Sequence, residues 1–172
     1  MFTIHRPTPV QYPHYYHSYI SKVEQDDLIT SLSKGENLLW EYIHTLPDDK
    51  LNYAYTAGKW TVKEIILHLI DAERIFAYRA LRFARADQTE LAGFDENDYV
   101  PQSNAGHRTR LSLYDEYKAV RASTIELFKS MNDETIDRSG KANGNDIAVR
   151  AIGYIIAGHE LHHLQVIKER YV

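Results

Sequence analysis

Apolar residues recur three or four positions apart in four segments of the chain, the spacing of one face of an α-helix. The first predicted helix follows the capping residues Asp26 and Asp27, and Pro47 ends it. The second begins with the capping box Thr61-Val-Lys-Glu64, in which hydroxyl and carboxylate each satisfy a free backbone donor. It is predicted to run to about Arg85.

A third helix is predicted from near Ser112, and a fourth from about Asp146 to the C-terminus. We find no internal repeat and no convincing strand. Four long helices in one chain predict an all-α fold, a four-helix bundle. About 25 residues separate the second and third helices, where bundle connections usually run about 2–8 residues. Such a long crossover lets these two helices run parallel, which predicts the order up-down-down-up.

The remaining segments suit a single domain spanning residues 1–172. Residues 1–23 contain three prolines and five aromatic residues without a clean period, so we expect an irregular N-terminal arm. Its tyrosines should hold it to the body of the domain. Residues 87–111 form the crossover loop, with Phe94, Asp95, Glu96, Asp98 and Tyr99 between a glycine and a proline.

Composition narrows the function classes. The chain has 44% hydrophobic and 26% charged residues, an ordinary globular balance. A formal charge of −4 without any Lys/Arg-rich run argues against nucleic-acid binding. There is no cysteine, which excludes disulfides and thiolate metal sites. The N-terminus lacks a signal-peptide pattern and no apolar stretch is long enough for a membrane span, so we expect a soluble, cytoplasmic protein.

The fourth predicted helix contains the string HELHH, which matches the zincin pattern H-E-x-x-H. His159 and His163 are four residues apart and therefore stack on one helix face, in an otherwise apolar stripe. His68 interrupts a similar apolar stripe on the second helix. A lone histidine there is more often a hydrogen-bonded core residue, but a bundle core can bring both stripes to one ion.

Three neutral imidazoles suit a divalent ion, with zinc or nickel favoured and iron or manganese as further candidates. They leave at least one coordination position open for water or substrate. A zincin peptidase needs a third ligand after the motif and a strand edge, but only nine residues follow His163 and none is a histidine. The other histidines are interpreted as surface or supporting polar residues: His5, His14, His17, His44, His107 and His162.

Three stretches resemble the DinB-like, YfiT-like superfamily of metal-dependent enzymes: GKWTVKEIILHLIDAERIFAYR, LAGFDENDYV and AIGYIIAGHELHHLQVIKERY. The most specific parts are W-(x7)-H-L-x-D-A-E around His68 and the G-H-E-x-H-H end. The resemblance covers nearly the whole chain. It implies an up-down-down-up bundle, commonly a homodimer, whose divalent metal is held by His68, His159 and His163. Relatives include thiol-dependent transferases and an isomerase that use low-molecular-weight thiols such as bacillithiol or mycothiol.

These observations leave two hypotheses for function. The first is a metal-dependent enzyme with a small-molecule substrate, either a hydrolase that activates water or a thiol-dependent transferase. The second is a non-catalytic metal or small-ligand binding protein of the stress response. A cavity that reaches the open coordination position distinguishes the two. No nucleotide-binding or serine-nucleophile motif is present.

No catalytic side chain can be assigned from the sequence. Glu160, Asp71 or neither could be the general base, and Glu64 is better explained by its capping role. We expect the loop 87–111 to shape substrate access, because selectivity usually comes from loops on a rigid scaffold. The alternative is that Phe94 and Tyr99 only plug the end of the bundle.

Overall fold

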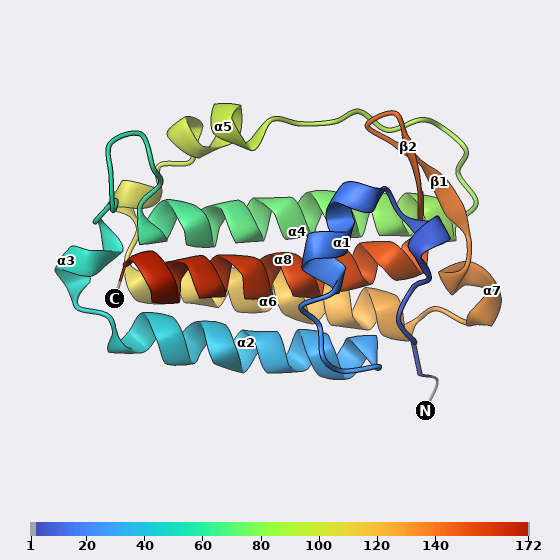
Figure 1. Cartoon of the computed structure of the whole chain (residues 1–172), viewed down its shortest axis with the longest axis horizontal. Coiled ribbons are helices and arrows are strands. Elements are labelled where there is room, and N and C mark those ends of the chain that lie inside the picture. The colour runs from blue at the N-terminus through green and yellow to red at the C-terminus, as the bar shows by residue number, and fades with distance from the viewer. Residues whose placement is uncertain (1–2, 172) are drawn as a thin grey trace.

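Four long helices form the body of the structure, a computed structural model that describes residues 3–171. They are α2 (Leu28–Thr45), α4 (Val62–Ala84), α6 (Arg110–Lys129) and α8 (Val149–Arg170). In Figure 1, α2 and α8 run in one direction, and α4 and α6 run in the other. This confirms the up-down-down-up four-helix bundle. Residues 1, 2 and 172, predicted to belong to the arm and the last helix, lie outside the described part.

Capping residues set the helix starts. The side chain of Asp27 accepts a hydrogen bond from the backbone nitrogen of Thr30 at the start of α2. Thr61 and Glu64 form the predicted capping box of α4, with Glu64 Oε2 2.7 Å from the Thr61 backbone nitrogen. The third helix begins two residues before the predicted Ser112, because Thr109 caps it instead. No helix within residues 3–171 is long and apolar enough to cross a membrane.

The crossover between α4 and α6 runs back along the full length of the bundle (Figure 1). It contains α5 (Glu96–Tyr99) and the 3-10 turns η3 (Val100–Gln102) and η4 (Ala105–His107). Two further short helices lie at the bundle ends: α3 (Asp48–Leu51) and α7 (Asp133–Ile136). The crossover is therefore a structured layer over α4, not a slack connection.

A small β-hairpin precedes α8, so the prediction that the chain has no strand was wrong. Strands β1 (Ser139–Ala142) and β2 (Asn145–Ala148) pair antiparallel, and α8 begins three residues later than the predicted Asp146. Asn143 and Gly144 form the two-residue turn, both with positive φ, of 51° and 74°. Asn-Gly is a preferred pair for this type of turn.

Replacing Gly144 with alanine is expected to lower the free energy of unfolding by about 1–2 kcal/mol, the usual cost of a left-handed backbone for a residue with a Cβ. A Cβ at Gly144 would meet no atom within 4 Å, so the cost comes from the backbone alone. Gly106→Ala is the matched control: its Cβ also has open space, and its φ is not positive. Urea unfolding of both variants measures the difference, and equal midpoints would contradict the strained turn.

The N-terminal arm packs against α8 instead of extending into solvent. It folds into the turns η1 (Pro9–Gln11) and η2 (His14–Tyr16) and the short helix α1 (His17–Ile20), which contacts α8. A Cβ on Gly158 of α8 would lie 2.1 Å from the carbonyl oxygen of Tyr19. Gly158 thus permits the close approach that brings the arm beside the neighbouring His159.

The buried apolar side chains fall into two clusters, one toward each end of the bundle. A buried polar layer separates them where the four long helices pass the middle of the molecule. This layer contains Glu73 of α4, Arg121 of α6, and His159 and Glu160 of α8. Buried polar groups need hydrogen-bond or charge partners, so this layer is a candidate region for a functional site.

Candidate metal centre

Three histidine side chains converge in the interior between α4 and α8. His68 Nε2 lies 3.0 Å from His159 Nε2, and His163 Nε2 lies 3.1 Å from the same atom. One ring nitrogen from each of the three lies within 4.8 Å of both others. The spacing of four residues on α8 and the facing position on α4 bring these rings together, as the two interrupted apolar stripes predicted.

Hydrogen bonds among the three rings cannot give every one of these ring nitrogens a partner. Nε2 of a neutral imidazole carries either one hydrogen or one lone pair, so His159 Nε2 can pair with only one of its two neighbours. A shared cation would accept a lone pair from all three nitrogens. With bonds of about 2.0–2.1 Å, nitrogens separated by right angles would be about 2.9 Å apart, and by tetrahedral angles about 3.3 Å. The observed separations of 3.0 and 3.1 Å fall in this range.

Burial keeps these imidazoles in the neutral form that can bind a cation. Desolvation lowers the pKa of His68 to about 4. It also lowers the pKa of His163 to about 3, with His68 and His162 adding to the effect. The pKa of His159 is also lowered well below its usual value, because burial and three neighbouring histidines all disfavour its charged form. At neutral pH all three lone pairs are free of protons.

A cavity of about 550 Å³ opens onto the cluster, and all three histidines contribute to its wall. This volume lies within the range of small-molecule sites. Trp60 packs over His68 with ring centroids 4.8 Å apart, and Tyr19 packs over His159 at 5.2 Å. The three-histidine cluster is therefore accessible from a pocket with aromatic walls and is not sealed in the core.

Glu160, one of the two candidate general bases, points away from the cavity. Its carboxylate lies 2.8 Å from Arg121 Nη1 and accepts a hydrogen bond from the Tyr117 hydroxyl. Arg121 also pairs with Glu73 at 2.8 Å, and all four side chains are buried. Burial raises the pKa of Glu160, while Arg121 and Tyr117 oppose the rise. Glu160 therefore belongs to a buried ion-pair network and is not placed to take a proton from a substrate.

The other candidate carboxylates also lie outside the cluster. Asp71 is partly exposed and pairs with Arg74 at 3.6 Å, and no hydrogen bond of the described residues joins it to His68. Glu64 is occupied by the capping box, as the sequence favoured. Neither carboxylate orients a histidine of the cluster. Nδ1 of His163 is buried without a hydrogen-bond partner in residues 3–171.

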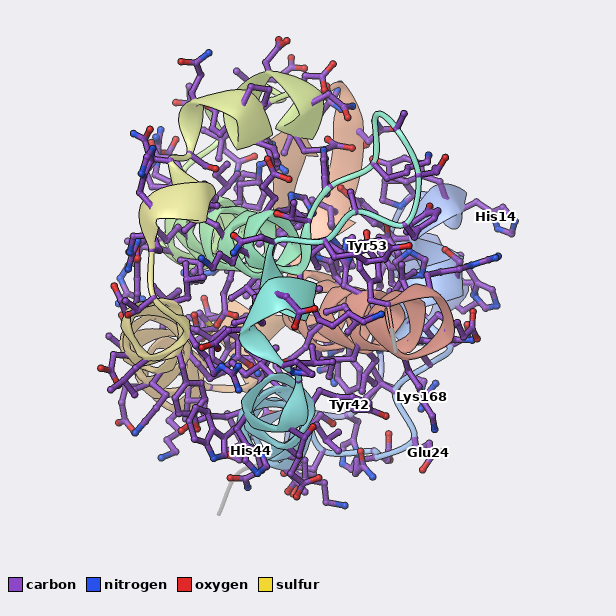
Figure 2. The ribbon with its side chains drawn as sticks, turned by 90° about the vertical axis from the view of Figure 1, so that its left-hand side faces the viewer. His14, Glu24, Tyr42, His44, Tyr53 and Lys168 are labelled. Carbon is purple, nitrogen blue, oxygen red and sulfur yellow. The ribbon has the colours of Figure 1, made fainter. Side chains whose placement is uncertain are left out.

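Most of the remaining histidines lie on the surface, as interpreted from the sequence. Figure 2 shows His14 and His44 projecting from the outside of the molecule, and both are exposed. His162 differs, because its ring lines the cavity 5.1 Å from that of His163 and 5.3 Å from Tyr19. It is thus a supporting residue of the cavity wall.

Several cavity residues were not found from the sequence. Tyr15, Tyr16 and Tyr19 come from the arm, and Asn143 and Asn145 come from the hairpin. The arm was expected only to pack, and the hairpin was missed. The Asn-Gly pair was a signal for the hairpin, although nothing in it showed that the turn would reach this cavity.

The crossover loop contributes to the cavity in part. Phe94 and Glu96 line it, whereas Tyr99 packs beside Phe94 with centroids 5.3 Å apart and remains 47% exposed. Backbone hydrogen bonds of 2.9 Å from Leu91 to Lys141 and from Asn143 to Leu91 attach the loop to the hairpin. Loop and hairpin therefore form one wall.

Comparisons with known proteins agree with this architecture. The profile of the DinB superfamily matches residues 31–167. Two curated proteins of Oceanobacillus iheyensis, each named "Putative metal-dependent hydrolase", are 26% identical over 155 residues and 24% identical over 148 residues. The first alignment covers 86% of this chain and 87% of the relative, and the second covers 84% of each.

Two solved structures from Bacillus subtilis have a similar fold. One is YfiT, described as "a probable metal-dependent hydrolase with an unusual four-helix bundle topology", with a TM-score of 0.75 and 18% identity over 83% of this chain and 82% of YfiT. The other is described as a DinB-like protein, yjoA, with a TM-score of 0.58 and 18% identity over 83% of this chain and 90% of the other. At this identity the likeness concerns the fold.

Proposed function

The chain belongs to the DinB superfamily, and on this premise we propose that it is a metal-dependent hydrolase of a small molecule. The observation that carries the proposal is the open cavity of about 550 Å³ that reaches the Nε2 atoms of His68, His159 and His163. A structural metal site would be closed by protein ligands, whereas a catalytic one keeps a position open. Curated relatives named as metal-dependent hydrolases support the same class of reaction.

In this proposal the three histidines hold a divalent ion, with zinc or nickel preferred for an all-nitrogen donor set. Such an ion, when bound, supplies Lewis-acid chemistry: it polarises a substrate oxygen and lowers the pKa of water. The rings of Trp60 and Tyr19 pack over His68 and His159, which restricts ring rotation and limits water near the nitrogens. His162 and Glu96 line the same cavity and are the candidates for accepting a proton from the attacking water.

We assign substrate selectivity to the wall made by the loop 87–111 and the hairpin. The metal ligands project from two rigid helices, so they should be held alike for different substrates. Phe94 supplies an aromatic surface of the cavity from the loop, and Asn143 supplies an amide from the hairpin. Tyr99 supports Phe94 from outside and is expected to matter less.

The test is a panel of ester, amide and phosphoester hydrolysis and of thiol transfer, run on zinc- and nickel-loaded protein beside His68→Ala. We expect hydrolytic turnover in the wild type and a loss of about 10²-fold or more in the variant, because removing a ligand removes the Lewis acid. Phe94→Ala should keep its metal while changing the range of substrates. Turnover only with thiol substrates would select the transferase, and equal turnover in wild type and His68→Ala would overturn the proposal.

Three expectations implied by the sequence stay predictions: the homodimer, the low-molecular-weight thiol and the cytoplasmic location. The non-catalytic binding protein remains the competing hypothesis. It predicts metal binding at the cluster without turnover of any substrate in the panel.

A further inference from the structure

A buried arginine forms part of the cavity wall at some distance from the histidine cluster. Arg79 lies on α4, eleven residues after His68, so the two side chains lie about 20° apart around the helix and about 16 Å apart along its axis. Arg79 is 5% exposed, and both residues line the same cavity. Helical side chains lean toward the N-terminus, which directs the guanidinium back toward the cluster.

The guanidinium is held between aromatic rings. Its central carbon lies 5.6 Å from the ring centre of Phe76 and 5.9 Å from that of Phe94. Nη2 donates a hydrogen bond of 2.9 Å to the carbonyl oxygen of Ala92. Arg79 is therefore positioned by α4 on one side and by the crossover loop on the other.

The charge of Arg79 has no carboxylate partner among residues 3–171, whereas Arg121, the other buried arginine of that range, pairs with two carboxylates. Nε and Nη1 donate to no protein atom in that range. They are also not sealed from solvent, since Nδ1 of His163 is the only buried side-chain nitrogen there without a partner. Because the side chain as a whole is buried in the cavity wall, these donors are available from the cavity.

We propose that Arg79 binds an oxyanion of the substrate, a carboxylate or a phosphate, while the reacting group lies at the three histidines. A planar guanidinium offers two parallel donors to such a group, which is a strong and directional contact. The aromatic rings between the two ends suit an apolar or aromatic body. This inference rests on the proposed function, and it adds the chemical class of the substrate.

Other charged groups around the cavity are compatible with this assignment. Glu96 lines the cavity from the loop without an ion pair to Arg79, and its charge helps to raise the pKa of Tyr19, after burial. The negative charge of Glu96 therefore acts on the part of the cavity near Tyr19, where it would disfavour the binding of an anion. Arg79 is the only arginine or lysine among the described residues that line the cavity.

The test measures binding of phenylacetate, its neutral isostere phenylacetamide, and phenyl phosphate by titration calorimetry, with the metal-loaded protein. We expect the wild type to prefer at least one anion over the amide by about 10- to 100-fold, the usual worth of a charged hydrogen bond. Arg79→Gln should lose the preference, and Arg79→Lys should keep part of it. Arg74→Gln is the matched control on the same helix, because Arg74 pairs with Glu116 at 2.8 Å outside the cavity.

His68→Ala separates this inference from the proposed function. If the anion binds Arg79, its preference over the amide persists in His68→Ala even when that variant loses its metal and turnover. A preference that survives in Arg79→Gln but disappears in His68→Ala would place the anion on the metal and overturn the inference. Equal binding of all three probes by the wild type would overturn it as well. Melting curves of Arg79→Gln and Arg79→Lys establish that both variants fold.

Discussion

Replacing Arg121 with alanine is expected to lower the free energy of unfolding by about 3–5 kcal/mol, because two buried carboxylates lose the one cation that pairs with them in the described part of the chain. Arg121 contacts Glu73 and Glu160 at 2.8 Å each, and its Nη1 also donates to the carbonyl oxygen of Leu32. All three charged side chains are at most 3% exposed, so water cannot replace the lost partner. For a chain of this length the melting temperature should fall by about 10 °C.

Two comparisons make this result specific. Arg74→Ala removes an arginine of similar charge whose ion pair with Glu116 is partly exposed, and it should cost about 1 kcal/mol or less. Neutralising the carboxylates together with the arginine, as Glu73→Gln and Glu160→Gln in Arg121→Gln, should recover part of the loss. If calorimetry gives the same melting temperature for Arg121→Ala and Arg74→Ala, the buried pair is not the source of stability assigned to it.

This network explains why the sequence alone did not determine the role of Glu160, the glutamate of HELHH. Glu160 lies 100° around the helix from His159, so the two side chains cannot both point into the metal site. Which neighbour lies at that angle depends on the arrangement of all four helices. Here α6 supplies Arg121, and Gly35 of α2 leaves the room, since a Cβ there would lie 2.0 Å from Glu160 Oε2.

The fold itself was largely predictable, because local signals determined it. The capping box at Thr61 and the apolar periodicity marked the helices, and the length of the crossover predicted their directions. The hairpin was missed because its strands are four residues each and are stabilised by tertiary contacts. Gly140, for example, packs directly beneath the ring of Phe83, where a Cβ would lie 2.2 Å from a ring carbon.

The residues of the candidate site also differ in how far the sequence alone predicts them. His68, His159 and His163 stood out because each breaks an apolar stripe, which is a property of a single helix. Arg79 shares a helix face with His68, but its importance depends on Ala92 and Phe94 of the loop closing around it. Such contacts join segments that are distant in the sequence, and no local sequence pattern predicts their relative positions.

Removing a single histidine of the cluster is expected to abolish retention of the metal. Protein purified without a histidine tag and dialysed against zinc or nickel should hold one ion per chain, and His159→Ala should hold close to none. His159 is the choice for this test because its Nε2 lies near both of the other ring nitrogens, at 3.0 and 3.1 Å. Elemental analysis measures the content directly.

The same ion should stabilise the fold, because the converging nitrogens exist only in the folded state. At a metal concentration of about 1,000 times Kd the gain is about 4 kcal/mol, or about 8–16 °C in melting temperature at this chain length. A chelator should remove that gain from the wild type and leave His159→Ala unchanged. His107→Ala, at an exposed position on the loop, and His162→Ala, on the cavity wall but outside the cluster, should match the wild type in metal content and in response to the chelator. Equal metal content and equal chelator response in wild type and His159→Ala would exclude the three histidines as the site, whatever activity the protein has.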